Sequence, residues 1–321
     1  MPKIYLVNMD FTQFDIEEKM AAEAGIELGF SQERDAKSTI ANCQDADGIV
    51  TSYGDFDREL FESLPKLKVV SRTGVGYDSI DVPAATDNGV FVCTAPGYAN
   101  EVVSDHAISM ALGVLRRTNE LDADIRAGVW DFARRRPLGQ CYGRTFGVVG
   151  MGAIGRACAR KAEGLGFKVV CWSRSLIPGR RTPEGYECLT FDELLETADV
   201  ISIHTALTPD THHLFDAQAF AKMKDTAVLV NTSRGSVVDT DALAEVLCRG
   251  ELWGAGLDVF EGEPADITRP IFAAPHTLFS AHAAYWSEES GVELRTRTMQ
   301  SAIDAVLGRK PIDCLNPTAW D

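Results

Sequence analysis

The fold is decided by the stretch Thr145-Phe146-Gly147-Val148-Val149-Gly150-Met151-Gly152-Ala153-Ile154-Gly155. Its apolar first half is typical of a buried strand, and its second half fits the pattern G-x-G-x-x-G. In that pattern the first glycine permits a tight turn, the second lets a pyrophosphate approach the backbone, and the third allows a helix to pack on the strand. Phosphate then lies at the helix N-terminus. The stretch predicts a dinucleotide site, with Gly150, Gly152, Ala153, Ile154 and Gly155 as cofactor-binding residues.

The sequence on the far side of the glycines supports this interpretation. A helical stretch, Arg156 to Glu163, follows them, and a second apolar run, Phe167 to Trp172, completes a strand-helix-strand unit. A glycine-rich turn that binds nothing is the alternative, and the complete unit favours the dinucleotide.

Short apolar runs alternate with amphipathic stretches along the rest of the chain, which is typical of parallel sheets in α/β proteins. Because 321 residues exceed one average domain, we expect two domains. The first set of predicted strands is Ile4 to Val7, Gly48 to Ser52, Leu67 to Ser71 and Val90 to Thr94. The second set begins at Thr145 and continues with Phe167 to Trp172, Val200 to His204, Ala227 to Asn231, Trp253 to Val259 and Thr277 to Ser280.

Composition disfavours several classes of function. The chain has 47 acidic and 31 basic residues, and its formal charge of -16 repels phosphate backbones and anionic lipid surfaces. We therefore expect neither nucleic acid nor a membrane as a partner. The eight Cys residues form no C-x-x-C pair, which predicts no metal site and no disulfide framework. No apolar run approaches the length of a membrane span, and we expect a cytoplasmic location.

The end of the second strand in a dinucleotide unit indicates which cofactor is used, because an acidic residue there hydrogen-bonds the ribose hydroxyls of NAD. Here the position is Ser173, followed by Arg174, and residues 164–183 contain no Asp or Glu. A guanidinium can bind a 2′-phosphate bidentately. We therefore expect Ser173 and Arg174 to bind NADP, with NAD as the second choice. The alternative for Arg174, and for Arg180 and Arg181 nearby, is an exposed loop charge.

Three polar segments each follow a predicted strand of the second set: Asn231 to Gly235, Asp258 to Pro264 and Ser280 to Ala284. The carboxyl ends of parallel strands line the ligand crevice, so Arg234, Glu263 and His282 are expected to converge beside a nicotinamide. Reduction of a 2-oxo acid needs a cation to hold the carboxylate and an acid to protonate the carbonyl oxygen. Arg234 suits the first role and His282 the second. Glu263 would orient the imidazole and favour its protonated form.

Each of these three has an ordinary structural alternative: a strand-end ion pair for the arginine, a loop carboxylate for the glutamate and a hydrogen-bonded core imidazole for the histidine. His106 and His204 are interpreted as structural rather than catalytic, because neither lies in a matching arginine and glutamate context. His204 and Thr232 are assigned to the residues beside the cofactor. The remaining assignments are His212, His213 and His276 to the surface or loops, and Arg134 to Arg136 to a solvated loop.

With these segments in view, the sequence resembles the D-isomer-specific 2-hydroxyacid dehydrogenases over nearly its whole length. The matching segments are Arg72 to Asp81, Gly150 to Gly155, Asn231 to Asp239, Gly256 to Pro264, and His282. The resemblance implies that Arg234, Glu263 and His282 are catalytic. It also implies that Asp258 lies near the nicotinamide carboxamide, and that backbone amides at Val75 and Gly76 help to hold the substrate carboxylate.

The same resemblance implies two domains with different functions. Residues 1–99 and 286–321 would form a flavodoxin-like substrate-binding domain, and residues 100–285 a Rossmann-type, doubly wound dinucleotide-binding domain. The helical stretch Asn100 to Arg117 would carry much of a homodimer interface.

Two departures from the family pattern limit the transfer. Ser173 stands where NAD-using members usually carry Asp, and Ala283 to Ser287 differ from the commoner sequence after the catalytic histidine. Arg72 and the aromatic residues near His282 are similar to those of D-lactate dehydrogenases and of the C-terminal binding protein branch. Arg72, Tyr98 and Trp286 are predicted to bind substrate, where an aromatic wall would suit an apolar side chain better than a phosphate. The alternative for Trp286 is that it caps the last helix or packs in the core.

The leading hypothesis is thus an NAD(P)-dependent D-2-hydroxyacid dehydrogenase that acts on a small 2-oxo or 2-hydroxy acid. The alternative from another class is a nucleotide-sensing, corepressor-like scaffold with little turnover. A formate-type or phosphite-type dehydrogenase is disfavoured, because Glu261 to Pro264 match the hydroxyacid pattern. The sequence does not identify the substrate, since one methylene in a pocket changes discrimination by only about 1–3 kcal/mol.

Overall fold

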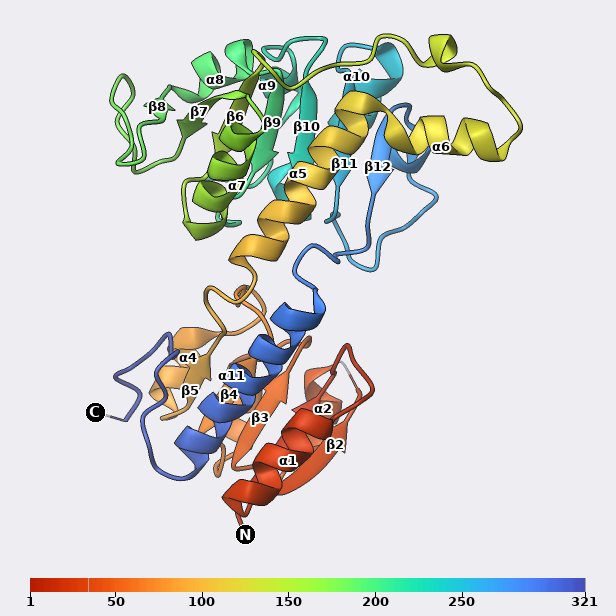
Figure 1. Cartoon of the computed structure of the whole chain (residues 1–321). Coiled ribbons are helices and arrows are strands. Elements are labelled where there is room, and N and C mark those ends of the chain that lie inside the picture. Colours follow the sequence, from red (N-terminus) through yellow and green to blue (C-terminus); the bar gives the residue numbers. More distant parts are fainter. Residues whose placement is uncertain (34, 321) are drawn as a thin grey trace. The chain divides into compact units, whose positions relative to one another are not determined.

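The structure is a computed structural model that describes residues 1–33 and 35–320 and divides into two compact units (Figure 1). Unit 1 comprises Met1–Tyr98 and Ser287–Asp321, and unit 2 comprises Ala99–Trp286. These limits lie within one residue of the predicted domain limits at 99/100 and 285/286. Asp321, which ends the predicted segment 286–321, lies outside the described residues.

Unit 1 is built on a five-stranded parallel sheet with the strand order β2-β1-β3-β4-β5. This is the flavodoxin-like order, with the first crossover on one side of β1 and the others on its opposite side. The strands are β1 (Lys3–Val7), β2 (Glu27–Ser31), β3 (Gly48–Thr51), β4 (Val69–Arg72) and β5 (Phe91–Cys93).

Helices cover both faces of this sheet, because successive strand residues point to opposite faces. Ile4 and Leu6 of β1 pack in the core beneath α1 and α11, while Tyr5 and Val7 pack in the core beneath α2, α3 and α4. The helices are α1 (Asp15–Ala24), α2 (Ala36–Asn42), α3 (Arg58–Ser63), α4 (Val82–Asp87) and α11 (Glu288–Val306). The C-terminal helix thus completes a core that the N-terminal residues begin.

Unit 2 is built on a seven-stranded parallel sheet with the order β12-β11-β10-β9-β6-β7-β8. The order reverses between β6 and β9, which is the switch point of a Rossmann-type doubly wound sheet. The strands are β6 (Thr145–Val149), β7 (Lys168–Trp172), β8 (Glu187–Cys188), β9 (Val200–Ile203), β10 (Val228–Asn231), β11 (Gly254–Leu257) and β12 (Thr277–Phe279). The two sheets together confirm the predicted α/β class.

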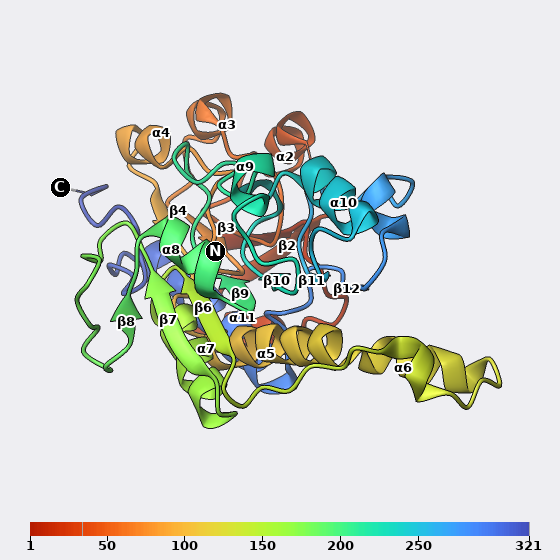
Figure 2. The same cartoon turned by 90° about the horizontal axis from the view of Figure 1, so that it is seen from above.

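The helices of unit 2 form a layer on each face of its sheet (Figures 1 and 2). One layer holds α5 (Asn100–Arg116) and α7 (Ala153–Gly164), and the other holds α8 (Phe191–Thr197), α9 (Ala217–Phe220) and α10 (Thr240–Arg249). The short 3-10 helices η2 (Gly235–Val237) and η3 (Pro270–Ala273) lie in connections. The predicted helix Asn100 to Arg117 is confirmed, and Arg117 ends it in a left-handed conformation with φ of 53°.

Two strands, β2 and β8, were not predicted. Both lie at an edge of their sheet, and β8 has only two residues. In β2 only Ser31 is buried, and Gly29 replaces a side chain that would otherwise collide with the ring of Tyr5. Neither sequence therefore has the continuous apolar run that marks a buried parallel strand.

An arm extends from the C-terminal end of α5 through α6 (Thr118–Arg126) to η1 (Phe132–Arg135), and Figure 2 shows α6 lying beyond the sheet. Arg135 donates to both carboxylate oxygens of Asp124, at 2.5 and 2.6 Å, and to Glu120 at 2.7 Å. The expectation of a solvated run from Arg134 to Arg136 is wrong for Arg135, because two carboxylates of α6 surround its guanidinium.

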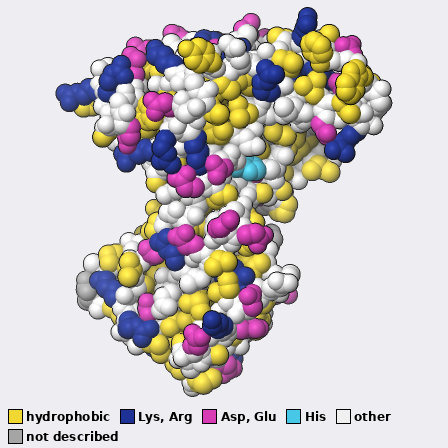
Figure 3. All heavy atoms as spheres, in the orientation of Figure 1, with side chains coloured by type: hydrophobic (Ala, Val, Ile, Leu, Met, Phe, Trp, Pro, Cys, Tyr) yellow, Lys and Arg dark blue, Asp and Glu magenta, His cyan; other side chains and the backbone are white. Residues whose placement is uncertain are grey.

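Charges of both signs mix on the face shown in Figure 3, over α5 and α7, where Lys161 pairs with Glu101 at 2.9 Å and with Asp105 at 2.7 Å. Among the described residues, no helix has both the length and the apolarity that a membrane span requires. In residues 1–33 and 35–320, no group of three or more His, Cys, Asp or Glu side chains is placed to hold a metal ion.

Candidate active site

The glycine loop after β6 has the geometry that a pyrophosphate requires. Gly150 has φ of 101°, and a Cβ there would lie 2.7 Å from the backbone of His204. A Cβ at Gly155 would collide with the carbonyl oxygen of Gly150, so this residue lets α7 pack against β6. A Cβ at Gly152 would meet nothing within 4 Å, which leaves open space at the start of α7. The first and third glycines are thus required by packing, and the second faces a space that a ligand could fill.

The N-terminus of α7 is bare. Gly152 is its N-cap residue, and no side chain caps the first turn. The amide groups of Ala153 and Ile154 lie in that turn, where N–H groups have no partner within the helix. Such a terminus attracts anions, because its amides and the helix dipole both favour negative charge.

The position that distinguishes NAD from NADP lies directly after β7. Ser173 follows Trp172, and Arg174 is half-exposed, with its Nη1 2.9 Å from Asp210 Oδ2 and 3.5 Å from Thr208 Oγ1. Asp210 is the partner that sequence analysis missed. It lies in a loop that Thr211 fixes by accepting from the amide of Thr208 at 2.8 Å and donating to the carbonyl of Ala206 at 2.7 Å.

His204 and Thr232 lie after the strands β9 and β10, near the switch point. Burial lowers the pKa of His204 to about 4, so its ring is neutral at pH 7, and its Nε2 is 2.9 Å from Ser202 Oγ. Thr232 Oγ1 is buried and has no hydrogen-bond partner among the described residues. A buried hydroxyl without a partner is unfavourable, and a ligand that occupies this edge could satisfy it.

Three loops bring the predicted catalytic residues to the carboxyl edge of β10, β11 and β12. Nδ1 of His282 lies 2.6 Å from Glu263 Oε2, and the amide of Phe260 donates to Glu263 Oε1 at 3.0 Å. Burial acts to raise the pKa of Glu263, but the hydrogen bond and charge of His282, the Phe260 amide and the charge of Arg234 outweigh it. The pKa of Glu263 is therefore held below its ordinary value, and its carboxylate is ionised beside the imidazole.

Arg234 is positioned by its own turn. Asn231, the last residue of β10, donates to the carbonyl of Arg234 at 2.9 Å and accepts from the amide of Ser233 at 3.0 Å. A Cβ at Gly235 would collide with the backbone of Phe260, so glycine lets the arginine turn approach the loop that carries Glu263. Asn231 and Gly235 were inside the quoted motif, but their tasks depend on contacts that the motif does not show.

The second carboxylate of the same loop, Glu261, has a different task. It accepts from the amide of Thr240 at 3.1 Å and contacts His213 Nε2 at 2.7 Å. The same contacts lower the pKa of Glu261 against the opposing effect of burial. His213 lies in a loop, as predicted, yet it anchors the Glu261 side of the loop. His276, also in a loop, contacts Glu120 Oε1 at 3.0 Å.

Asp258, which follows β11, holds the turn that carries His282. Its side chain is 1% exposed and accepts from the amides of Ala283 and Ala284 at 2.8 and 3.0 Å. Its carbonyl also accepts from the amide of His282 at 2.7 Å. His282 itself has φ of 51°, a left-handed conformation that is uncommon for a residue with a Cβ. The Asp258 contacts fix this conformation, a task that sequence analysis did not assign.

The predicted substrate-binding residues lie in both units. In unit 1, Arg72 ends β4, and its guanidinium covers Gly74 so closely that a Cβ there would collide with it. Val75 is 45% exposed, whereas Tyr98 is only 8% exposed. Trp286 belongs to unit 2 and is 39% exposed, so the alternative that it packs in a core is wrong.

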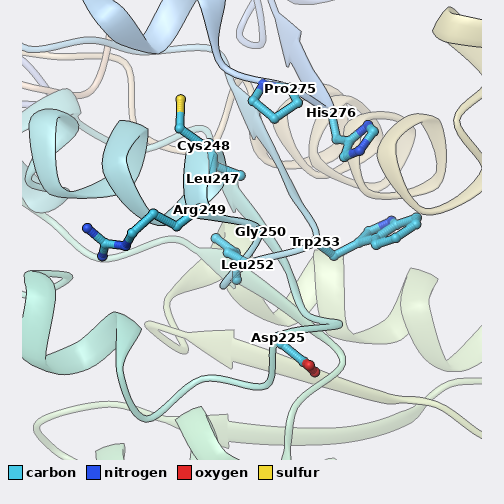
Figure 4. Close-up of a pocket in the computed structure, with 9 residues that line it drawn as sticks. All are labelled: Asp225, Leu247, Cys248, Arg249, Gly250, Leu252, Trp253, Pro275 and His276. Carbon is cyan, nitrogen blue, oxygen red and sulfur yellow. The ribbon is translucent and has the colours of Figure 1, made fainter.

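A separate cavity of about 300 Å³ lies at the opposite end of the strands (Figure 4). Leu252 and Trp253 precede β11, His276 precedes β12, and all three line it. Arg249 also lines it, but its guanidinium is paired with Glu251 at 2.8 Å. The cavity is therefore remote from the edge that carries Arg234, Glu263 and His282.

Comparison with known proteins agrees with this geometry. Residues 108–284 match the model of the D-isomer specific 2-hydroxyacid dehydrogenase, NAD binding domain. The chain is 38% identical over 284 residues to a glyoxylate reductase of Korarchaeum cryptofilum, covering 87% of this chain and 86% of that protein. The chain belongs to the D-isomer-specific 2-hydroxyacid dehydrogenase family. Within this family it also resembles solved structures along almost its entire length.

One such structure is a glyoxylate reductase from Paecilomyes thermophila, which is 31% identical with a TM-score of 0.86 and covers 98% of both chains. Another is a D-lactate dehydrogenase from Aquifex aeolicus complexed with NAD and lactic acid, 27% identical with a TM-score of 0.86, covering 97% of this chain and 98% of that one. The chain is thus an NAD(P)-dependent 2-hydroxyacid dehydrogenase, and the corepressor-like alternative is not favoured.

Proposed function

We propose that this dehydrogenase reduces a small 2-oxo acid of the glyoxylate class to the D-2-hydroxy acid, with NADPH preferred over NADH. The observation that carries the proposal is the His282–Glu263 pair, 2.6 Å apart, at the sheet edge where the Arg234 turn also ends. Glyoxylate reductases among the relatives support the choice of substrate class.

The three side chains would divide the chemistry between them. Because Nδ1 of His282 is bound to Glu263, its Nε2 is the nitrogen left to give a proton to the carbonyl oxygen. The ionised Glu263 stabilises the imidazolium that gives this proton. Arg234 would hold the substrate carboxylate and polarise the carbonyl. When bound, a nicotinamide would supply the hydride, so that this hydride and the proton from His282 would convert the oxo group to a hydroxyl.

The residues around the cofactor loop fit a dinucleotide. Gly150, Gly152 and Gly155 with the amides of Ala153 and Ile154 would hold the pyrophosphate at the bare end of α7. The His204 backbone follows β9 at the switch point, and Thr232 Oγ1 follows the neighbouring strand β10; the nicotinamide half would bind beside them. Asp258 is proposed to lie beside the carboxamide. At the other end, Ser173 and Arg174 would bind a 2′-phosphate.

For the substrate, the family resemblance supports the backbone amides of Val75 and Gly76 as carboxylate donors. Arg72, Tyr98 and Trp286 are proposed as further substrate-binding residues. The division into a substrate-binding segment, 1–99 with 286–321, and a dinucleotide-binding segment, 100–285, is part of the same proposal.

We also propose a homodimer in the cytoplasm, with α5 and the arm of α6 and η1 in its interface. Exposed aromatic side chains on the arm support this: Trp130 is 90% exposed and Phe132 59% exposed. Large exposed apolar side chains are typical of protein interfaces.

A panel of 2-oxo acids assayed with NADPH and NADH tests the proposed function. Glyoxylate and hydroxypyruvate are expected to be reduced faster than bulkier 2-oxo acids, and faster with NADPH. His282→Ala and Arg234→Ala should each retain cofactor binding while losing turnover by about a hundredfold or more. Either variant working at the wild-type rate would remove the assigned role, and a preference for NADH would remove the cofactor assignment.

A further inference from the structure

α5 lies on β11 in a register that two close contacts define. A Cβ at Gly254 would lie 2.7 Å from Val114 Cγ1, and a Cβ at Gly256 would lie 2.9 Å from Met110 Cβ. Moving four residues toward the N-terminus of α5, from Val114 to Met110, thus corresponds to moving two residues toward the C-terminus of β11, from Gly254 to Gly256. This match is expected, because four helical residues rise about 6 Å and two strand residues about 6.6 Å.

One further step in the same register places His106 of α5 beside Asp258, the residue that follows β11. The step is realised in the structure: His106 Nε2 lies 3.7 Å from Asp258 Oδ1 and 2.9 Å from Ser280 Oγ. His106 is thus held beside the carboxyl edge of the sheet by the packing of the whole helix, and not by a local loop.

The hydrogen-bond directions in this cluster follow from counting hydrogens. Ser280 has one hydroxyl hydrogen, which it donates to Asp258 Oδ1. Its oxygen can therefore only accept from His106, so Nε2 of His106 must carry a hydrogen. His106 thus donates to Ser280, and Ser280 donates to Asp258.

Asp258 in turn holds the turn that carries His282, the proposed proton donor. Its carboxylate accepts from the amides of Ala283 and Ala284, directly after His282, and its carbonyl accepts from the amide of His282. These bonds surround the one residue of the turn with a left-handed backbone. Because a buried carboxylate with several partners has few alternative positions, its orientation determines where the His282 ring points.

We infer that His106 is a positioning residue for the reaction, which acts through Ser280 and Asp258 to aim His282 at the carbonyl oxygen. The inference rests on the proposed role of His282 as the acid. It assigns His106 no contact with substrate or cofactor. Its contribution is geometric, and misplacement of a reacting group by about 1 Å can cost a hundredfold in rate.

The test compares side chains of equal length at position 106. H106M removes the hydrogen-bond donor, whereas H106Q retains an N–H at the end of a chain of the same length. H106M is expected to lower kcat about tenfold or more, and H106Q to stay within roughly threefold of the wild type.

S280A should lower kcat by about as much as H106M does. The double variant H106M/S280A should have a kcat no lower than that of the slower single variant, because the two residues act in one chain of hydrogen bonds. The dissociation constant of NADPH, measured by nicotinamide fluorescence, should stay within about twofold in each variant.

Two further measurements keep the outcomes distinct. Nitrogen NMR of histidine-labelled wild-type protein should show a hydrogen on Nε2 of His106, and its absence would overturn the inference whatever the kinetics. A wild-type kcat in H106M, or independent and multiplying effects of H106M and S280A, would overturn it as well. H282A separates the two proposals: an active H282A removes the proposed function, whereas an inactive H282A with a fully active H106M removes only this inference.

Discussion

At the scale of single residues, Glu263 should set the pH dependence of reduction. Burial acts to raise its pKa, but the hydrogen bond and charge of His282, the amide of Phe260 and the charge of Arg234 hold that pKa below its ordinary value. The carboxylate therefore stays ionised through neutral pH and stabilises a proton on the imidazole. E263Q removes this charge and with it the electrostatic stabilisation that the carboxylate gives to the imidazolium.

The expected result for E263Q is a basic limb of the kcat/KM profile that moves to lower pH. Steady-state rates from pH 5 to pH 9 with saturating NADPH measure it. E261Q is the matched control, because Glu261 contacts His213 and Thr240 rather than His282. A profile of E263Q that coincides with the wild type would show that Glu263 does not govern the proton on His282.

Arg174 should decide between the two cofactors. Its guanidinium is half-exposed at the end of β7, and a hydrogen bond to a charged group contributes about 1.5–3 kcal/mol, or roughly tenfold to a hundredfold in affinity. R174A should therefore raise the KM for NADPH by that factor and leave the KM for NADH nearly unchanged. S173D should shift the preference toward NADH, because a carboxylate repels the 2′-phosphate.

The ion pair between Arg174 and Asp210 allows a second variant, D210N, that should strengthen NADPH binding rather than weaken it. Asp210 Oδ2 lies 2.9 Å from Arg174 Nη1, so a 2′-phosphate must compete with it for the guanidinium. D210N should lower the KM for NADPH by up to about fivefold, because an exposed pair contributes no more than about 1 kcal/mol. If both R174A and D210N leave the ratio of the KM values for NADPH and NADH unchanged, Arg174 does not bind the 2′-phosphate.

How far these residues could be predicted depends on the range of their contacts. The position of Arg234, Glu263 and His282 at one sheet edge could be predicted from sequence, because each follows an apolar strand and parallel strands end at one edge. The positions of His106 and Asp210 could not, because their partners lie 174 and 36 residues away along the chain. Only packing of α5 on β11, or of one loop against another, brings such pairs together.

At the scale of elements, the strand-helix-strand pattern predicted the centre of each sheet better than its edges. After its first residue, Thr145, the strand β6 is buried and has no polar side chain, whereas β2 at an edge begins and ends with a polar residue. An edge strand has one neighbour and faces solvent, so its sequence need not be apolar. The glycine loop between β6 and α7 was predictable because Gly150 and Gly155 each satisfy a separate packing requirement, while Gly152 leaves open space at the start of α7.

That separation of demands gives a prediction for the loop as an element. G152A should fold with a loss of less than about 1 kcal/mol, because the new Cβ meets nothing and only the N-cap preference is lost. Its cofactor affinity should fall at least about tenfold, because the methyl group enters the space proposed for the pyrophosphate. Thermal melting and fluorescence titration with NADPH measure the two quantities.

The neighbouring glycines supply the controls. G155A should lower both stability and affinity, because its Cβ collides with the Gly150 carbonyl and displaces α7. G164A, at the open end of the same helix, should change neither. A G152A protein that binds NADPH as tightly as the wild type would place the pyrophosphate elsewhere.

At the scale of the whole molecule, the presence of two parallel sheets was predictable from the apolar runs of the chain, whereas their flavodoxin-like and Rossmann-type topologies were implied only by resemblance to the family. The return of α11 to the core begun by β1 was given only by resemblance to the family. No local pattern reports it, since Met299 and Ile303 of α11 meet Ile4 and Leu6 across almost the full length of the chain. The same holds for oligomeric state, which depends on surface that one chain leaves uncovered.

The arm of α6 and η1 carries the prediction at this scale. Arg117, at the end of α5, and Arg135 of η1 both bind Glu120, so ion pairs hold the arm to α5 while Trp130 stays 90% exposed. A rigid support with exposed aromatic side chains is suited to association, because little freedom is lost on binding. W130S is therefore expected to shift the mass in solution from about twice 35.0 kDa toward 35.0 kDa, with a dimer dissociation constant at least about tenfold higher. Analytical ultracentrifugation over a range of concentrations measures both.

I312S removes an equally exposed apolar side chain from unit 1 and should leave the mass unchanged. If W130S and the wild type sediment alike as dimers, the arm lies outside the interface, and if the wild type is a monomer the homodimer proposal is wrong.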